Sequence, residues 1–132
     1  MLDIKFILNN MELVKQNVRD RHVEADVDKV VALYNELRTI QRELEVTRST
    51  INKASGKFTE LDDVGKAKLR EEVSSLKARS RELEEQLRPL RAEYEVKLLQ
   101  IPNLVSTDTP KGKDDTDNVI LRTVGKPRRF TF

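Results

Sequence analysis

The sequence predicts an all-α fold: a long antiparallel two-helix coiled-coil hairpin with a short N-terminal helical unit at its base. Apolar residues from Val30 to Ile51 recur three and four positions apart, which is the spacing of one helix face. A second such run extends from Leu69 to Leu90, and the two runs mirror each other about position 60, as antiparallel heptad seams do. The composition agrees, because 36% charged and 5% aromatic residues suit a thin arm better than a thick core.

The mirror also predicts a register for the seam. In this register the numbers of facing residues add up to 120, so that Ser80 faces Ile40 and Thr47 faces Val73. These two weak layers are expected to lend the arm flexibility. The apolar layers would pair Val30 with Leu90, Leu37 with Leu83, Leu44 with Leu76 and Ile51 with Leu69.

Residues 1–22 form the predicted N-terminal helical unit. Asn9 followed by Glu12 resembles a capping box and predicts a helix start there. The apolar residues of this unit lie at helical spacing and need a surface to cover them. The expected surface is the base of the hairpin, formed by Val27, Val31, Tyr94 and Leu98.

The first long helix is predicted over 27–55, with Asp26 as its N-cap. A tip turn follows over 56–62, and Thr59 or Asp62 is expected to cap the return helix over 63–100. Pro102 ends that helix, because the residue before a proline avoids helical geometry. Pro89 falls inside the return helix, where its missing donor and its ring predict a local bend.

The C-terminal residues 102–132 differ in character from the predicted arm, 1–101. Residues 106–118 are polar and indicate an extended linker, whereas 119–124 favour a β-strand. Phe130 and Phe132 alternate at strand spacing. A lone strand has no partner in a helical hairpin, so we expect this tail to lead into a following domain that is absent from the chain.

The chain offers no constellation that suggests catalysis, a cofactor or a metal. It has no cysteine, which excludes a disulfide and a thiolate zinc site. The single histidine, His22, is interpreted as a surface residue, and the acidic group at 114–117 lacks the spacing of a calcium loop. We therefore expect no enzyme activity from this chain alone. With no signal peptide or membrane span in the sequence, a cytoplasmic location without membrane partners is expected.

The net charge is only +2, but the charge is unevenly distributed. Residues 47–70, around the predicted tip, hold six basic and three acidic side chains, whereas residues 1–46 hold seven basic and nine acidic ones. A basic surface suits a phosphate-bearing partner. An ordinary solvated helix surface with mixed charges is the alternative interpretation.

The ends of the chain carry the most specific motifs. These are MLDIK at 1–5 with Asn10, Glu12 and Val14, LLQIPN at 98–103, PKGKDDTDN at 110–118 and GKPRRFTF at 125–132. Together they resemble the N-terminal arm of bacterial-type seryl-tRNA synthetases. Met11 stands where that family often has proline, Pro89 is unusual for the arm, and 105–109 lacks the histidine and prolines often found there. The chain also ends before any class II synthetase motif.

This resemblance implies an arm that grips serine tRNA by its long variable arm and nearby elbow. It also implies a homodimer formed through the missing catalytic domain, where ATP and magnesium would bind and serine would be attached. RNA helices are recognised largely by shape, through phosphates and 2′-hydroxyls, so outward basic residues are the candidates and no DNA partner is expected. Those candidates are Arg38, Arg42, Arg48, Lys53, Lys57, Lys66, Arg70, Lys77, Arg81 and Arg88.

Three other interpretations stay open at this point. Arg81 with Glu85, and Arg88 with Glu84, lie four residues apart and could be engaged in salt bridges within the helix instead of contacting RNA. The chain could also be a structural hairpin that binds protein, or a stand-alone paralogue of the synthetase with another partner. The heptads fit a structural hairpin equally well, but the two ends of the chain do not.

Overall fold

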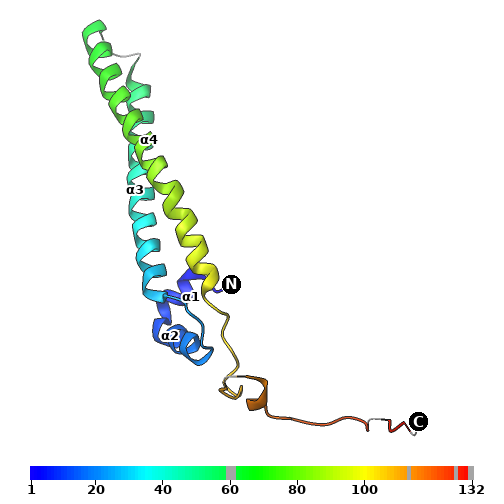
Figure 1. Cartoon of the computed structure of the whole chain (residues 1–132). Coiled ribbons are helices and arrows are strands. Elements are labelled where there is room, and N and C mark those ends of the chain that lie inside the picture. The colour runs from blue at the N-terminus through cyan, green and yellow to red at the C-terminus, as the bar shows by residue number, and fades with distance from the viewer. Residues whose placement is uncertain (59–61, 113, 127, 131–132) are drawn as a thin grey trace.

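A long helical hairpin dominates the computed structural model, which describes residues 1–58, 62–112, 114–126 and 128–130 (Figure 1). Its elements are α1 (Ile4–Asn9), α2 (Met11–Asp20), α3 (Val27–Lys57), α4 (Asp63–Gln100) and a short 3-10 turn, η2 (Asp115–Asp117). Helices α3 and α4 pack along each other, and α1 and α2 lie at their root. The predicted all-α hairpin is confirmed.

The N-terminal unit contains two helices. Asp3 caps α1 by accepting a hydrogen bond from the Lys5 amide at 2.6 Å. Helix α2 begins after Asn10, whose side chain makes no capping bond to it and donates to the Phe6 carbonyl instead. The predicted capping box at Asn9 is therefore wrong: Asn9 is the last residue of α1.

The long helices have clear start signals. The Asp26 carboxylate accepts from the Lys29 amide at 2.9 Å, as predicted. The Asp62 carboxylate accepts from the Gly65 amide at 2.9 Å and caps α4; Thr59, the other candidate cap, lies outside the described residues. Helix α3 continues through Ser55 and Gly56 to Lys57, two residues beyond its predicted end.

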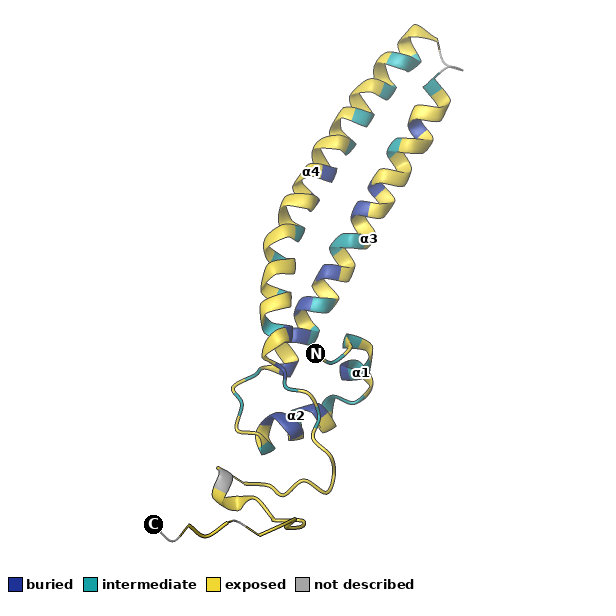
Figure 2. Cartoon of the chain, turned by 90° about the vertical axis from the view of Figure 1, so that its right-hand side faces the viewer, coloured by how far each residue is buried: buried dark blue, intermediate teal, exposed yellow. Residues whose placement is uncertain are grey.

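Pro89 does not interrupt α4, which is one continuous helix over 63–100. The proline is exposed, so the carbonyl that lacks its helical donor can be hydrated instead. Figure 2 accordingly draws α4 as one uninterrupted helix. The local bend stays a prediction.

The root holds the best-buried apolar cluster. Ile7 and Val14 from the N-terminal helices meet Val30, Leu98 and Ile101 of the hairpin, each at most 6% exposed. The predicted covering surface is confirmed, because Val27 belongs to this cluster and Val31 and Tyr94 pack against it. In Figure 2 the buried and half-buried segments of α3 and α4 lie along the sides of the two ribbons that face each other.

A strap of residues 103–112 lies across α2. The buried Asn17 side chain donates to the Asn103 carbonyl at 3.3 Å and accepts from the Val105 amide at 3.2 Å. Arg21 donates to the same Asn103 carbonyl at 3.0 Å, and Lys111 pairs with Asp20 at 2.8 Å. These contacts fix where the chain leaves the arm.

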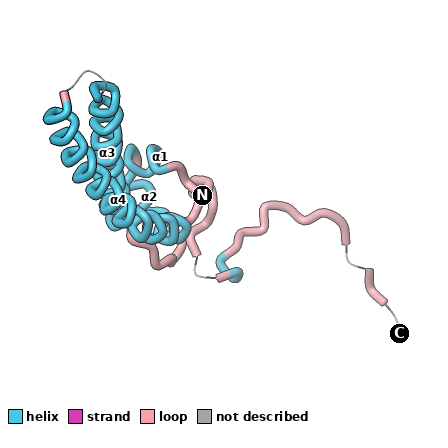
Figure 3. The backbone as a smooth tube through the Cα atoms, turned by 90° about the horizontal axis from the view of Figure 1, so that it is seen from above, coloured by secondary structure: helices cyan, strands magenta, loops and turns pink. Residues whose placement is uncertain are grey.

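The rest of the tail is extended and solvent-exposed. No strand occurs among the described residues, so the strand predicted over 119–124 is wrong (Figure 3). Ile120 and Leu121 are 82% and 94% exposed. A strand forms only when a neighbour accepts and donates its backbone hydrogen bonds, and the helical arm offers none. Phe132 lies outside the described residues.

The predicted register of the seam is also wrong. In that register the flanking position that meets Arg48 across the seam would be Lys77, one heptad and roughly 10 Å along the helix axis from Glu84, yet the Arg48 guanidinium lies 2.8 Å from the Glu84 carboxylate. Likewise, the Tyr34 and Tyr94 ring centroids are 6.2 Å apart. These contacts indicate a register shifted by one heptad. It pairs Leu37 with Leu90, Leu44 with Leu83, Ile51 with Leu76 and Phe58 with Leu69.

The corrected register has two consequences. It sets Thr47 opposite Ser80, so both buried hydroxyls share one layer; Thr47 Oγ1 donates to the Glu43 carbonyl at 2.8 Å and Ser80 Oγ to Glu84 at 3.3 Å. It also sets Lys57 level with Arg70. Residues 63–69 of α4 therefore extend beyond the end of α3 and form the far end of the arm (Figure 1).

The register can be tested by cysteine cross-linking, because the chain has no cysteine of its own. The Leu44→Cys, Leu83→Cys double variant should oxidise to an intramolecular disulfide. Leu44→Cys with Leu76→Cys should not, because those positions are offset by roughly 10 Å along the axis, beyond the reach of a disulfide. Mass spectrometry of the oxidised, dilute chain measures both. Cross-linking in the Leu76 variant alone would restore the register with sum 120.

Candidate nucleic-acid interface

The seam divides the exposed arm into two long faces with different charge. Each face combines the flanking positions of α3 with those of α4 that lie beside them in the observed register. Most of the charged side chains that can meet a partner belong to one face or the other. The two faces differ in how far their cations are already occupied.

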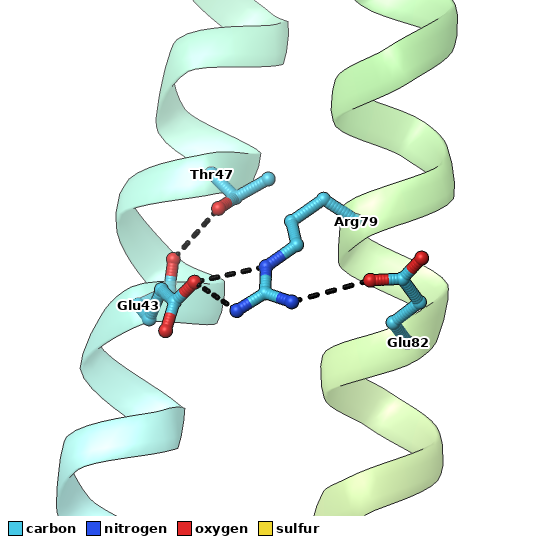
Figure 4. A network of polar contacts seen from close by, with 4 residues as sticks. All are labelled: Glu43, Thr47, Arg79 and Glu82. Carbon is cyan, nitrogen blue, oxygen red and sulfur yellow. Dashed lines mark hydrogen bonds and ion pairs between the residues drawn. The ribbon is translucent and has the colours of Figure 1, made fainter.

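The first face, called the mixed face, carries Lys29, Glu43, Arg79, Glu82 and Glu93, and ion pairs among these residues link the two helices. Arg79 donates to Glu43 at 2.7 Å from Nη2 and 3.0 Å from Nε, and to Glu82 at 3.2 Å (Figure 4). The hydrogen bonds that Arg79 donates to these two glutamates, the one to Glu43 first, raise the pKa of its guanidinium. Lys29 pairs with Glu93 at 3.3 Å. The cations that link the two helices on this face are thus already paired with carboxylates.

The second face, called the basic face, is richer in cations. Its α4 stripe steps by three and four residues from Lys77 through Arg81, Glu84 and Arg88 to Arg91, all exposed. Three shallow grooves along this face are lined by both helices. Seven basic side chains define the face: Arg38, Arg48, Arg70, Lys77, Arg81, Arg88 and Arg91. Three acidic ones accompany them: Glu45, Glu84 and Glu95.

The middle groove contains the only ion pair that the described residues form across this face. Arg48 meets Glu84 there, beside Arg88 and Arg91. The hydrogen bond from Arg48 is the main cause that holds the pKa of Glu84 below its usual value of 4.5, with a smaller contribution from Ser80. Glu84 is therefore ionised at neutral pH and partly neutralises the centre of the face.

The two outer grooves each contain an aromatic ring with an arginine over it. Near the root, the Arg38 guanidinium lies 5.8 Å from the centroid of the Tyr34 ring. Near the tip, Arg70 lies 5.2 Å from the centroid of Phe58. Such contacts orient the guanidinium while leaving its N–H groups available to other acceptors.

The structure brings six of the ten predicted residues together on the basic face: Arg38, Arg48, Arg70, Lys77, Arg81 and Arg88. Arg81 and Arg88 have no ion pair within the part of the chain that the structure describes, so the intrahelical salt bridges considered as the alternative do not form. Arg42 lies on the outer side of α3, in a groove with Glu43 and Val46. Lys53 and Lys57 are exposed elsewhere, and Lys66 is half-buried, 3.9 Å from Asp63.

Sequence reasoning missed Arg91, which lines two of the three grooves. Its signal was present in the sequence. Lys77, Glu84 and Arg91 are one heptad apart, and this spacing keeps them on one side of a coiled-coil helix. The outward set could have been extended by that rule.

The described residues carry no cluster of three histidine or acidic side chains that could hold a metal ion. Within the same residues, no helix combines the length and the apolar character needed to cross a membrane. The arrangement can thus offer an elongated basic surface, with donors spaced along a rigid rod.

Comparison with known proteins gives the chain a family. Residues 1–105 match the family model described as the seryl-tRNA synthetase N-terminal domain. The whole chain is 40% identical to part of a serine–tRNA ligase from Rubrobacter xylanophilus, 37% to one from Methylobacillus flagellatus and 34% to one from Borrelia garinii subsp. bavariensis. In each case it covers 31% of the relative, so the chain spans about a third of these proteins. The chain belongs to the seryl-tRNA synthetase family, and its residues 1–105 are the N-terminal domain of that family.

Proposed function

We propose that this chain is the tRNA-binding arm of a seryl-tRNA synthetase and that its basic face lies along the long variable arm and elbow of serine tRNA. The parent protein would be a cytoplasmic serine–tRNA ligase that dimerises through its catalytic domain. ATP and magnesium would bind in that domain, where serine is attached to the RNA. The arm would act by holding the RNA in position for this step.

The observation that carries the proposal is the excess of cations over carboxylates on one long face of the rod. The basic face has seven cations against three carboxylates, and six of the cations have no ion pair among the described residues. Phosphate contacts supply much of the affinity for RNA, and their geometry follows the helix rather than the bases. Such a face would recognise the shape of an RNA helix and not its base sequence.

The dimensions of the arm also suit an RNA stem. The 31 residues of α3 extend for roughly 46 Å at 1.5 Å per residue. Arginines account for six of the seven cations on the face, and the planar fork of arginine matches phosphate oxygens better than an ammonium does. The apolar seam holds the two antiparallel helices side by side over this length, so the donors stay in line.

The first test measures binding of this chain to serine tRNA with and without its long variable arm. We expect deletion of that arm to abolish most of the binding, because the basic face would then have no phosphates to lie along. Binding is measured at low and moderate salt by a filter or anisotropy assay. Equal affinity for both RNAs would leave only nonspecific charge attraction and refute the proposal.

A charge-reversal experiment tests which face is used. The triple variant Arg70→Glu, Arg81→Glu, Arg88→Glu should bind serine tRNA at least about tenfold more weakly. It should also flatten the dependence of affinity on salt, by roughly 0.7 to 0.9 in log–log slope for each phosphate that the variant no longer neutralises. The matched control is Arg42→Glu, Lys53→Glu, Lys57→Glu, which changes the charge equally on other surfaces. An equal weakening in both variants would show that net charge alone matters.

The Arg48–Glu84 pair predicts a gain of affinity. Glu84→Gln removes a carboxylate from the centre of the basic face and frees Arg48, so we expect binding to tighten by roughly three- to tenfold at low salt. Both side chains are about half exposed, so breaking their pair should cost little stability. The control is Glu82→Gln on the mixed face. Weaker binding in Glu84→Gln would mean that the pair positions Arg48 for the RNA.

A further inference from the structure

The groove of the basic face nearest the root contains both tyrosines of the chain. Tyr34 from α3 and Tyr94 from α4 lie with ring centroids 6.2 Å apart and planes tilted by 34°. They line a hollow of about 160 Å³, with Leu37 beside them and with Arg38, Gln41, Arg91 and Glu95 around them. Aromatic, cationic, amide and carboxylate groups thus converge at one place on the face.

Packing explains only part of this arrangement. Tyr94 occupies a seam position and packs against the root cluster. Burial is the main cause of the raised pKa of its hydroxyl. Tyr34 is different, because it flanks the seam, is half-buried and has the Arg38 guanidinium 5.8 Å from its ring centroid. A ligand can reach the exposed part of this ring without disturbing the seam.

The surrounding polar groups match the edge of a nucleobase. Arg38 and Arg91 supply N–H donors, Glu95 supplies acceptors and Gln41 supplies both. Unpaired bases in RNA are held in this way, by stacking on aromatic rings or guanidinium planes and by hydrogen bonds to their edges. The hollow at the tip around Phe58 lacks this set: Ser55, Leu69, Arg70, Val73, Ser74 and Lys77 line it, with no carboxylate and no amide side chain.

We infer that the Tyr34–Tyr94 hollow binds one unpaired nucleobase of the RNA that lies along the basic face. This inference rests on the proposed function and adds an interaction of different chemistry to it. The base would stack on the Tyr34 ring at the mouth of the hollow, between Arg38 and Arg91. The phosphate contacts would still orient the RNA stem, while the hollow would fix its position along the arm, because an unpaired base occurs only at particular places in a folded RNA.

The composition of the chain provides a direct probe. It has two tyrosines and no tryptophan, so 3-fluorotyrosine places both of its fluorine labels in this hollow. Tyr34→Phe identifies which resonance belongs to Tyr34. On titration of the full chain with serine tRNA, we expect the Tyr34 resonance to move upfield, as stacking beneath another ring requires. Bound tRNA with both resonances unmoved would overturn the inference and leave the proposed function intact.

Affinity measurements separate stacking from charge. Tyr34→Leu should weaken serine tRNA binding about tenfold, in line with the removal of one base–aromatic stack. It should leave the slope of log affinity against log salt unchanged, because the same phosphates remain neutralised. Tyr34→Phe, the matched control that keeps the ring, should bind within about twofold of the unaltered chain. Thermal unfolding by circular dichroism checks that each variant keeps the hairpin.

The remaining outcomes are also decisive. Unchanged affinity in Tyr34→Leu would refute the stacking interaction. A flattened salt slope in Tyr34→Leu would show that the ring only positions Arg38 for a phosphate, which refutes it equally. Failure of the unaltered chain to bind serine tRNA at all would overturn this inference together with the proposed function, whereas the other results affect the inference alone.

Discussion

The apolar seam between α3 and α4 is the interaction on which the rest of the structure depends. A two-helix arm has no second layer, so each seam residue is covered only by the facing helix and its own neighbours, and positions such as Ile40, Leu76 and Leu87 stay half-exposed. Burial of apolar area provides the driving force. The register of this seam decides which surface charges meet across it, and therefore which cations remain free.

That selection gives the arm its functional character. On the mixed face, Arg79 is held by Glu43 and Glu82. On the basic face, Arg48 alone has such a partner among the described residues. The same composition in another register would pair different side chains and would distribute the free cations differently. The proposed recognition of a polyanion would thus depend on helix packing as much as on the number of arginines.

The two long helices could be predicted from the sequence, but the register between them could not. Periodicity and the Asp26 and Asp62 caps define the long helices closely, because these are local signals. A heptad repeat, however, fits its partner almost equally well after a shift of one heptad, and only contacts such as Arg48–Glu84 decide between registers. One clue in the sequence favoured the observed register. It places the two polar seam residues, Thr47 and Ser80, in one layer, whereas the predicted register set each of them against an aliphatic residue. The predicted strand failed for a similar reason, since a strand depends on a neighbour that the local sequence does not encode.

The contrast between the two faces gives the rod a dipole perpendicular to its long axis. A uniform electric field exerts no net force on such a dipole, but it does exert a torque. Near a polyanion the arm would therefore rotate about its own axis until the arginine side is turned toward the charge, before any atoms touch. An arm that approaches with its mixed face toward the polyanion would then turn before contact, and would not need to bind, dissociate and approach again. Dissolved ions screen this effect beyond about 10 Å at 0.1 M, which limits the rotation to the last moments of approach.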